Sequence, residues 1–79
     1  MNLGVATGKR IKELLFEKNM TQYKLQKITC LNEKTLRDLI NGKTKDVKLS
    51  TIFLIANAFE MSISEFVSSP LFDQENIET

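Results

Sequence analysis

The sequence has no histidine and no tryptophan, and its 79 residues include only one cysteine, one proline and three glycines. The single thiol, Cys30, cannot form an internal disulfide, and without histidine the chain offers no ordinary zinc-ligand set. The lack of histidine also removes the commonest general base, and no phosphate-binding glycine loop or nucleophile motif is present. We therefore expect neither catalysis nor a bound metal or cofactor.

Long apolar segments are missing as well. No run approaches the roughly 18 apolar residues that span a bilayer, and the N-terminus has no apolar stretch typical of a signal peptide. A composition of 42% hydrophobic and 27% charged residues is that of an ordinary globular chain. We expect one cytoplasmic domain, with no membrane partner and no evident small-molecule ligand.

Charge is distributed unevenly along the chain, although the net charge is only +1. Residues 21–48 contain seven Lys or Arg against three Asp or Glu, an excess of +4, whereas residues 73–79 contain three acids and no base. The acidic end therefore masks a basic middle. This pattern favours a polyanionic partner for the middle of the chain.

Helix-start signals recur, whereas strand signals are absent. A hydrophobic residue, a capping Thr, Asn or Ser, and a second hydrophobic residue four positions later form a hydrophobic staple. The pattern occurs with Thr21, Asn32, Ser50 and Ser62 as capping residues, and Glu65 completes a capping box with Ser62. Four staples predict four helices.

An earlier helix is predicted by the apolar stripe of Ile11, Leu14 and Leu15, which Asn19 would end in a left-handed conformation. The expected helices lie near residues 6–18, 22–29, 33–41, 50–59 and 63–68, followed by a polar, frayed tail.

The second and third expected helices are joined by about three residues, so they should cross steeply as a helix-turn-helix unit. An apolar seam would hold them together, formed by Leu25, Ile28, Leu31, Leu36, Leu39 and Ile40. The residues left outward on the third helix are all polar or charged: Glu33, Lys34, Arg37, Asp38 and Asn41. The Asn41-Gly42 pair predicts a left-handed helix end before a basic loop.

Five motifs follow one another in a single register across residues 8–67. They are Arg10-Ile11-Lys12-Glu13-Leu14, Thr21-Gln22-x-x-Leu25, Thr35-Leu36-x-x-Leu39-x-Asn41-Gly42-Lys43, Thr51-Ile52-x-x-Ile55-Ala56-x-Ala58-Phe59 and Ser62-Ile63-x-Glu65-Phe66. Together they resemble the phage-repressor-like helix-turn-helix family, also called Cro/C1-type or XRE family. The resemblance implies a compact, all-α, five-helix domain of the lambda-repressor-like type over residues 1–69. Residues 70–79 would form a polar, acidic C-terminal tail.

The resemblance also implies a sequence-specific transcriptional regulator, expected to be a repressor, that reads the major groove of double-stranded DNA with its third helix. The residues expected to contact bases are Glu33, Lys34, Arg37 and Asp38. The residues expected to contact phosphates are Gln22, Thr35, Asn41, Lys43 and Lys45. Two simpler roles stay open: Glu33 can stabilise the start of its helix, and Asp38 can pair with Lys34.

A homodimer on a palindromic operator is expected, because one recognition helix reads too few base pairs to mark a site in a genome. The residues expected at the dimer interface are Phe66, Val67, Leu71 and Phe72, with Phe53 and Leu54 as the next candidates. The alternative is a protein-interaction module or antitoxin-like partner protein with the same fold, which the acids on the third helix keep open.

The chain departs from the family pattern at three positions. Gln26 stands where a small residue is usual, and Leu54 where a charged residue is common. Cys30 stands where the turn usually has glycine, and a left-handed non-glycine residue costs about 1–2 kcal/mol. The turn is thus either strained or differently shaped. Because a cysteine is most often a small buried hydrophobic residue, we expect the Cys30 side chain to be buried.

Overall fold

The structure is a computed structural model that describes residues 1–78, and it is all-helical within that range. Its elements are the α-helices α1 (Leu3–Glu17), α2 (Gln22–Thr29), α3 (Glu33–Ile40), α4 (Leu49–Ala58) and α5 (Ile63–Phe66), and the 3-10 turns η1 (Pro70–Phe72) and η2 (Gln74–Asn76). This confirms the expected all-α, five-helix domain.

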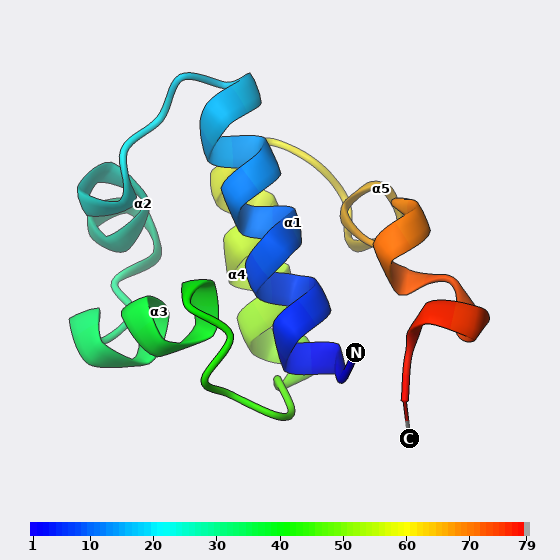
Figure 1. The fold of residues 1–79 in the computed structure, drawn as a ribbon. Coiled ribbons are helices and arrows are strands. Elements are labelled where there is room, and N and C mark those ends of the chain that lie inside the picture. Colours follow the sequence, from blue (N-terminus) through cyan, green and yellow to red (C-terminus); the bar gives the residue numbers. More distant parts are fainter. Residues whose placement is uncertain (79) are drawn as a thin grey trace.

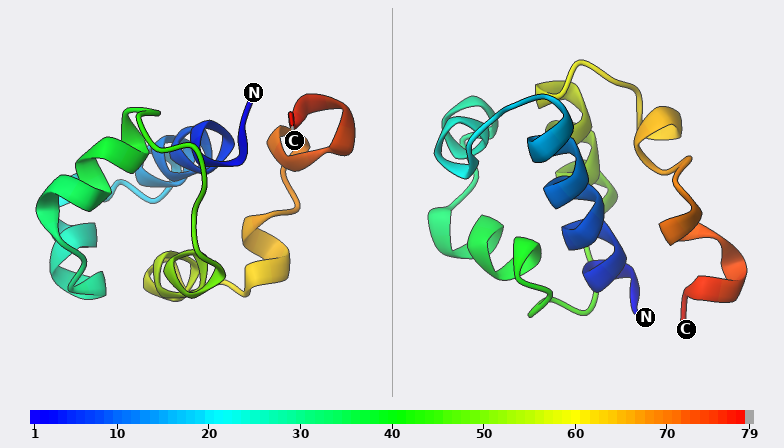
Figure 2. Two further views of the ribbon diagram at one scale, coloured as in Figure 1. Left: turned by 90° about the horizontal axis from the view of Figure 1, so that it is seen from below. Right: turned by 45° about the horizontal axis from the view of Figure 1, so that its top comes forward.

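The elements form two layers with α1 and α4 in the middle (Figures 1 and 2). In one layer α1 packs between α3 and η1, and in the other α4 packs between α2 and α5. The α2–α3 pair therefore lies on one flank, and α5 with the two 3-10 turns lies on the other (Figure 1). The core between the layers contains Ile11, Leu14, Leu25, Leu36, Leu39, Ile40, Ile52, Ile55, Ala56, Phe59 and Phe66.

Helix α1 begins three residues before the expected position, because Asn2 caps it through its side-chain oxygen, which accepts from the Val5 amide at 2.8 Å. Two glycines in this first part of α1 allow close packing on the second half of the helix-turn-helix. A Cβ on Gly8 would overlap the Leu39 carbonyl oxygen, and a Cβ on Gly4 would overlap that of Thr44. The periodicity of α1 gives no hint of these two contacts.

Three of the four predicted caps are confirmed. Thr21 accepts from the Lys24 amide at 3.1 Å, Asn32 caps α3, and Ser62 with Glu65 forms the predicted capping box. The cap predicted at Ser50 is wrong. Helix α4 begins at Leu49, after an extended residue that makes no side-chain cap bond.

The turn between α2 and α3 is left-handed at Cys30, with φ 58°, as the strained alternative predicted. Cys30 is exposed, however, so the expectation of a buried small hydrophobe is wrong. Ile28 also differs from the prediction, because its side chain is 49% exposed instead of lying in the seam. Gln26 closes the turn, since its side-chain amide donates to the Leu31 carbonyl at 3.3 Å.

The C-terminal segment is not frayed, as residues 70–76 form the two 3-10 turns. Helix α5 ends at Phe66, where the Arg10 side chain donates to the last carbonyl at 2.8 Å. The Phe66 ring is fully buried, and the Phe72 ring packs beside it at 6.1 Å between centroids.

The expected dimer interface is therefore wrong in its central residue: Phe66 belongs to the core of the monomer and cannot reach a second copy. Val67 and Phe72 pack against the same core, and Leu71 is half-buried. The apolar residues of this segment close one end of the domain. The sequence has more apolar residues here than one small core seemed to need. The structure explains this surplus, because residues 70–72 fold back and pack against α1.

Candidate nucleic-acid interface

The outward face of α3, formed by Glu33, Lys34, Arg37, Asp38 and Asn41, carries no apolar side chain. The three residues on the other side of the helix, Leu36, Leu39 and Ile40, are buried in the core. A helix of eight residues thus presents one apolar and one charged side. The structure brings together all four residues that were expected to contact bases.

The four charged residues of this face pair with one another. The Lys34 ammonium donates to the Asp38 carboxylate at 2.8 Å, as the sequence predicted, and the Arg37 guanidinium donates to Glu33 at 3.2 Å. Both pairs have i,i+4 spacing, which places the partners on adjacent turns. The outward face of α3 therefore carries two cations and two anions.

Asp38 lies among several cations. The hydrogen bond from Lys34 is the main reason that the pKa of Asp38 is lower than its ordinary value, and the nearby charges of Lys34, Lys43 and Arg37 act in the same direction. A carboxyl group with a lowered pKa is ionised throughout the neutral range. Asp38 is thus a permanent acceptor at the edge of this face.

Gln22, at the start of α2, faces the start of α3. Gln22, Tyr23, Gln26 and Glu33 line one cleft of about 230 Å³. Amide groups in the first turn of a helix attract anions, so this cleft places an anion-binding helix end beside the charged face of α3. The structure therefore brings Gln22, a residue expected to contact phosphate, close to Glu33, a residue expected to contact bases.

The loop of residues 43–48 continues the surface beyond α3. Gly42 has φ 74°, which gives the predicted left-handed helix end. The Lys43 amide donates to the Asp38 carbonyl at 2.8 Å, and the Lys45 carbonyl accepts from the Gly4 amide at 2.8 Å. Backbone bonds to α3 and α1 hold this loop, while Lys43, Lys45 and Lys48 are exposed.

Thr35 lies in the first turn of α3, and Asn41 follows its last residue. Thr35 is exposed and lines a cleft of about 250 Å³ between α3 and the loop, together with Thr44 and Lys48. Asn41 is the exposed C-cap of α3. Both residues therefore border the loop and not the cleft at Gln22.

Sequence reasoning missed two features of this surface. The first is the Glu33–Arg37 pair, whose i,i+4 spacing of opposite charges could have revealed it. The second is Tyr23 on α2, which is 67% exposed and lies under the Lys27 ammonium at 5.2 Å. Tyr23 therefore lines the cleft between α2 and α3 as an exposed aromatic residue next to Gln22 in the chain.

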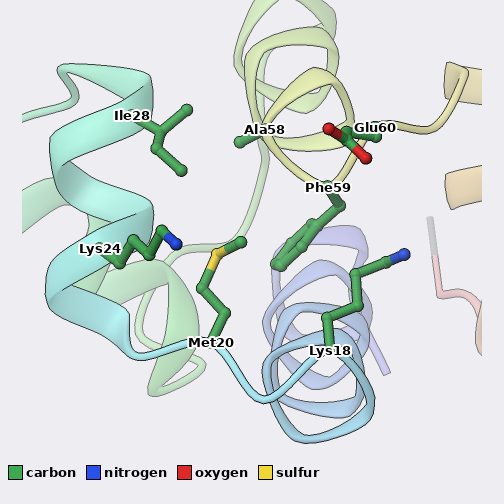
Figure 3. A pocket seen from close by; sticks show the side chains of 7 residues that line it. All are labelled: Lys18, Met20, Lys24, Ile28, Ala58, Phe59 and Glu60. Carbon is green, nitrogen blue, oxygen red and sulfur yellow. The ribbon is translucent and has the colours of Figure 1, made fainter.

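A third hollow, the α2–α4 groove, lies between α2 and the end of α4 and has a volume of about 470 Å³. Figure 3 shows Lys24 and Ile28 on α2 across from Ala58 and Phe59, with Met20 between the two sides. Lys18 and Glu60 complete the rim (Figure 3). Apolar and charged side chains thus share the lining of this groove.

Within residues 1–78, no group of three or more His, Cys, Asp or Glu side chains is arranged to hold a metal ion. None of the helices described is both long enough and apolar enough to cross a membrane.

The short turn, the buried seam and the polar outward helix define a helix-turn-helix protein. Residues 10–70 match the family of Cro/C1-type HTH DNA-binding domains, and the chain belongs to this family. It is a DNA-binding protein of the class of transcription regulators.

Two solved structures are similar to this chain. The restriction-modification controller protein C.AhdI from Aeromonas hydrophila has 25% sequence identity and a TM-score of 0.70, over 80% of this chain and 94% of that protein. The prophage Lp1 protein 11 shares the fold with a TM-score of 0.80 and 21% identity, over 94% of this chain and 99% of that protein. No curated protein sequence matches the chain.

Proposed function

We propose that the protein is a sequence-specific transcription regulator that reads the major groove of double-stranded DNA with α3. The observation that carries this proposal is the outward face of α3, which has only polar and charged side chains, whereas the apolar residues Leu36, Leu39 and Ile40 of that helix are buried. Arg37 and Lys34 would donate to the acceptors of guanine, and Glu33 or Asp38 would accept from a cytosine amino group. Base edges offer such donors and acceptors only within the grooves.

The phosphate contacts would come from the edges of this face. Gln22 and the first amides of α2 would meet one backbone strand, because helix N-termini attract anions. Thr35, Asn41, Lys43 and Lys45 would meet the other, next to the anchored loop. Phosphate contacts fix the register of the protein on the duplex, and base contacts select the sequence.

The proposal is tested by selecting bound sequences from a random duplex pool and then comparing the preferred site with a scrambled duplex. We expect the preferred site to bind about 10³-fold or more tightly at physiological salt, with log K falling as log salt rises. Equal binding of both duplexes would contradict the proposed readout by α3.

A regulator of this kind acts as a repressor when its bound form blocks the transcription machinery, and we propose this mode. A reporter gene placed downstream of the selected site should lose expression when the protein is present. Increased expression of the reporter would instead show that the protein is an activator.

We further propose that the protein binds a palindromic site as a homodimer, with half-sites about 34 Å apart. Helix α4 supports a new location for the interface, because Leu49, Phe53 and Leu54 are 66%, 55% and 40% exposed. Phe53→Glu should shift sedimentation from dimer to monomer. Phe16→Glu, which changes a ring that is 90% exposed on α1, is the matched control. A dimer that survives Phe53→Glu would place the interface elsewhere.

The second candidate function is binding of a protein partner, and the α2–α4 groove favours it. The groove combines apolar side chains with two ammonium groups, of Lys18 and Lys24, and one carboxylate, of Glu60. This mixed lining suits a partner segment that is partly apolar and carries an excess of carboxylates. Neither lysine forms an ion pair within residues 1–78. A protein that only binds such a partner would show no salt-dependent affinity for random duplex, whereas a DNA-binding protein must.

A further inference from the structure

The two ion pairs of the outward face of α3 run in opposite directions along the helix. In one pair the acid, Glu33, precedes the base, Arg37, and in the other the base, Lys34, precedes the acid, Asp38. The face therefore has no net charge and no charge gradient along the helix axis. Both of its cations are already paired in the free protein.

The loop of residues 43–48 differs in this respect. Lys43, Lys45 and Lys48 form no ion pair within residues 1–78. An unpaired lysine that reaches a phosphate releases counterions, and each such contact steepens the dependence of log K on log salt by about 0.9. A cation held by a carboxylate on its own helix contributes less, because the carboxylate stays close to the phosphate that the cation would neutralise.

We propose that Glu33 and Asp38 are specificity-determining residues, which hold Arg37 and Lys34 across the outward face of α3 and thereby weaken binding to generic DNA. This inference rests on the proposed function. At the preferred site the base edges replace the carboxylates as partners. Elsewhere the cations stay paired, and the two carboxylates repel the duplex.

The exchange is favourable only at matching bases. An exposed i,i+4 ion pair favours the paired state by a factor of about two. A bidentate contact to the correct base raises the affinity about 5- to 150-fold over that for a wrong base. Breaking the ion pair therefore costs much less free energy than a contact with the correct base contributes. A mismatched base offers no such contact to offset this cost, and the repulsion between carboxylate and phosphate remains.

The test uses two variants, each with a matched control that removes the same charge elsewhere. Glu33→Gln is compared with Glu75→Gln, and Asp38→Asn with Asp73→Asn. Glu75 and Asp73 are exposed, and the segment of residues 70–76 that contains them lies on the flank opposite α3 (Figure 1). All four proteins are titrated with a random duplex and with the selected site between 0.1 and 1 M salt, and thermal unfolding verifies that each is folded.

For the random duplex, Glu33→Gln and Asp38→Asn should each bind about three- to eightfold more tightly at 0.1 M salt. The upper value is the change in affinity that one phosphate contact, with a slope of about 0.9, produces when the salt concentration falls from 1 M to 0.1 M. The salt dependence should steepen by up to about 0.9, and the ratio of specific to random affinity should fall. The controls should match the original protein, because their charges lie on the other flank of the domain and salt screens interactions between distant exposed charges.

Random-duplex affinities and salt slopes equal to those of the controls would overturn this inference. The proposed function would stand in that case, because the original protein would still prefer its selected site. If the original protein showed no preference among duplexes, the proposed function would fail and the inference with it.

Discussion

Helix α1 holds the two flanks of the domain by opposite means. On the helix-turn-helix side, Gly4 and Gly8 remove side chains so that the backbone of α3 and of the following loop can approach closely. On the C-terminal side, Arg10 extends a long side chain that donates to the carbonyls of Glu65 and Phe66 at 3.2 and 2.8 Å. The first contact fixes the proposed DNA-binding surface to the core, and the second closes the end of the core.

The two kinds of contact should tolerate mutation to different extents. A backbone-to-backbone approach cannot adjust to an added methyl group without moving the whole element. A side-chain bridge can be removed while the helices that it joins keep their places. Changes at the glycine side should therefore alter both stability and DNA binding, and changes at the arginine side should alter stability alone.

Gly8→Ala should have the largest effect. The added methyl overlaps the Leu39 carbonyl and would force α3 away from α1, at about 3 kcal/mol of unfolding free energy. Affinity for the selected site should fall as well, because α3 is displaced. Thermal unfolding and duplex titration measure the two effects. Lys9→Ala, the exposed neighbour, is the control, and a Gly8→Ala protein as stable as this control would refute the close approach.

Arg10→Ala should reduce the unfolding free energy by about 2 kcal/mol, because two carbonyls at the end of α5 lose a charged donor. Below the melting temperature the affinity for DNA should not change. Lys12→Ala, on the exposed side of α1, should leave both quantities near those of the original protein. A loss of DNA affinity in the folded Arg10→Ala protein would break the distinction between the flanks.

Arg37→Ala should lower the affinity for the selected site by about 1–3 kcal/mol and flatten the preference at one base position. Titration against a panel of singly substituted sites measures the preference. A variant that keeps the original sequence preference would show that Arg37 does not read a base.

Cys30→Gly should raise the unfolding free energy by about 0.5–1 kcal/mol. Relief of the left-handed strain at φ 58° exceeds the additional entropy of glycine in the unfolded chain. Asn19→Gly is the matched comparison, since Asn19 has φ 51° but asparagine tolerates this region, so its gain should be smaller. A drop in melting temperature for Cys30→Gly would show that the thiol makes a contact worth more than the strain.

Lys43→Ala should have the smallest effect on any one duplex and should weaken all duplexes alike. The salt slope should decrease by about one unit, because one phosphate contact is lost. Lys18→Ala, in the α2–α4 groove, should leave the slope unchanged. Loss of sequence preference in the Lys43→Ala protein would assign the loop to base contact instead.

Local chemistry let the sequence predict much of the helix-turn-helix flank. The caps at Thr21 and Asn32 and the Lys34–Asp38 pair depend on residues within five positions of one another. Short-range patterns of this kind determine helix starts, turns and i,i+4 pairs. The left-handed conformation at Cys30 is one of the two alternatives that the family resemblance leaves open.

The remaining features depend on tertiary contacts, which local patterns do not encode. The close approach of α1 to the carbonyls of Leu39 and Thr44 depends on Gly4 and Gly8, which the apolar stripe of α1 does not reveal. The burial of Phe66 depends on residues 70–72 folding back, and the sequence reveals only that apolar residues are in surplus there. The roles assigned to Glu33, Arg37 and the loop lysines remain predictions.

The central claim, that the helix-turn-helix flank meets DNA while the C-terminal flank closes the core, is tested most directly by mapping amide chemical shifts by NMR during titration with the selected duplex. We expect the largest chemical-shift changes at residues 22–23, 33–38 and 41–45, and small changes at residues 63–76. Changes confined to the α2–α4 groove or to residues 63–76, with residues 33–38 unaffected, would contradict this claim.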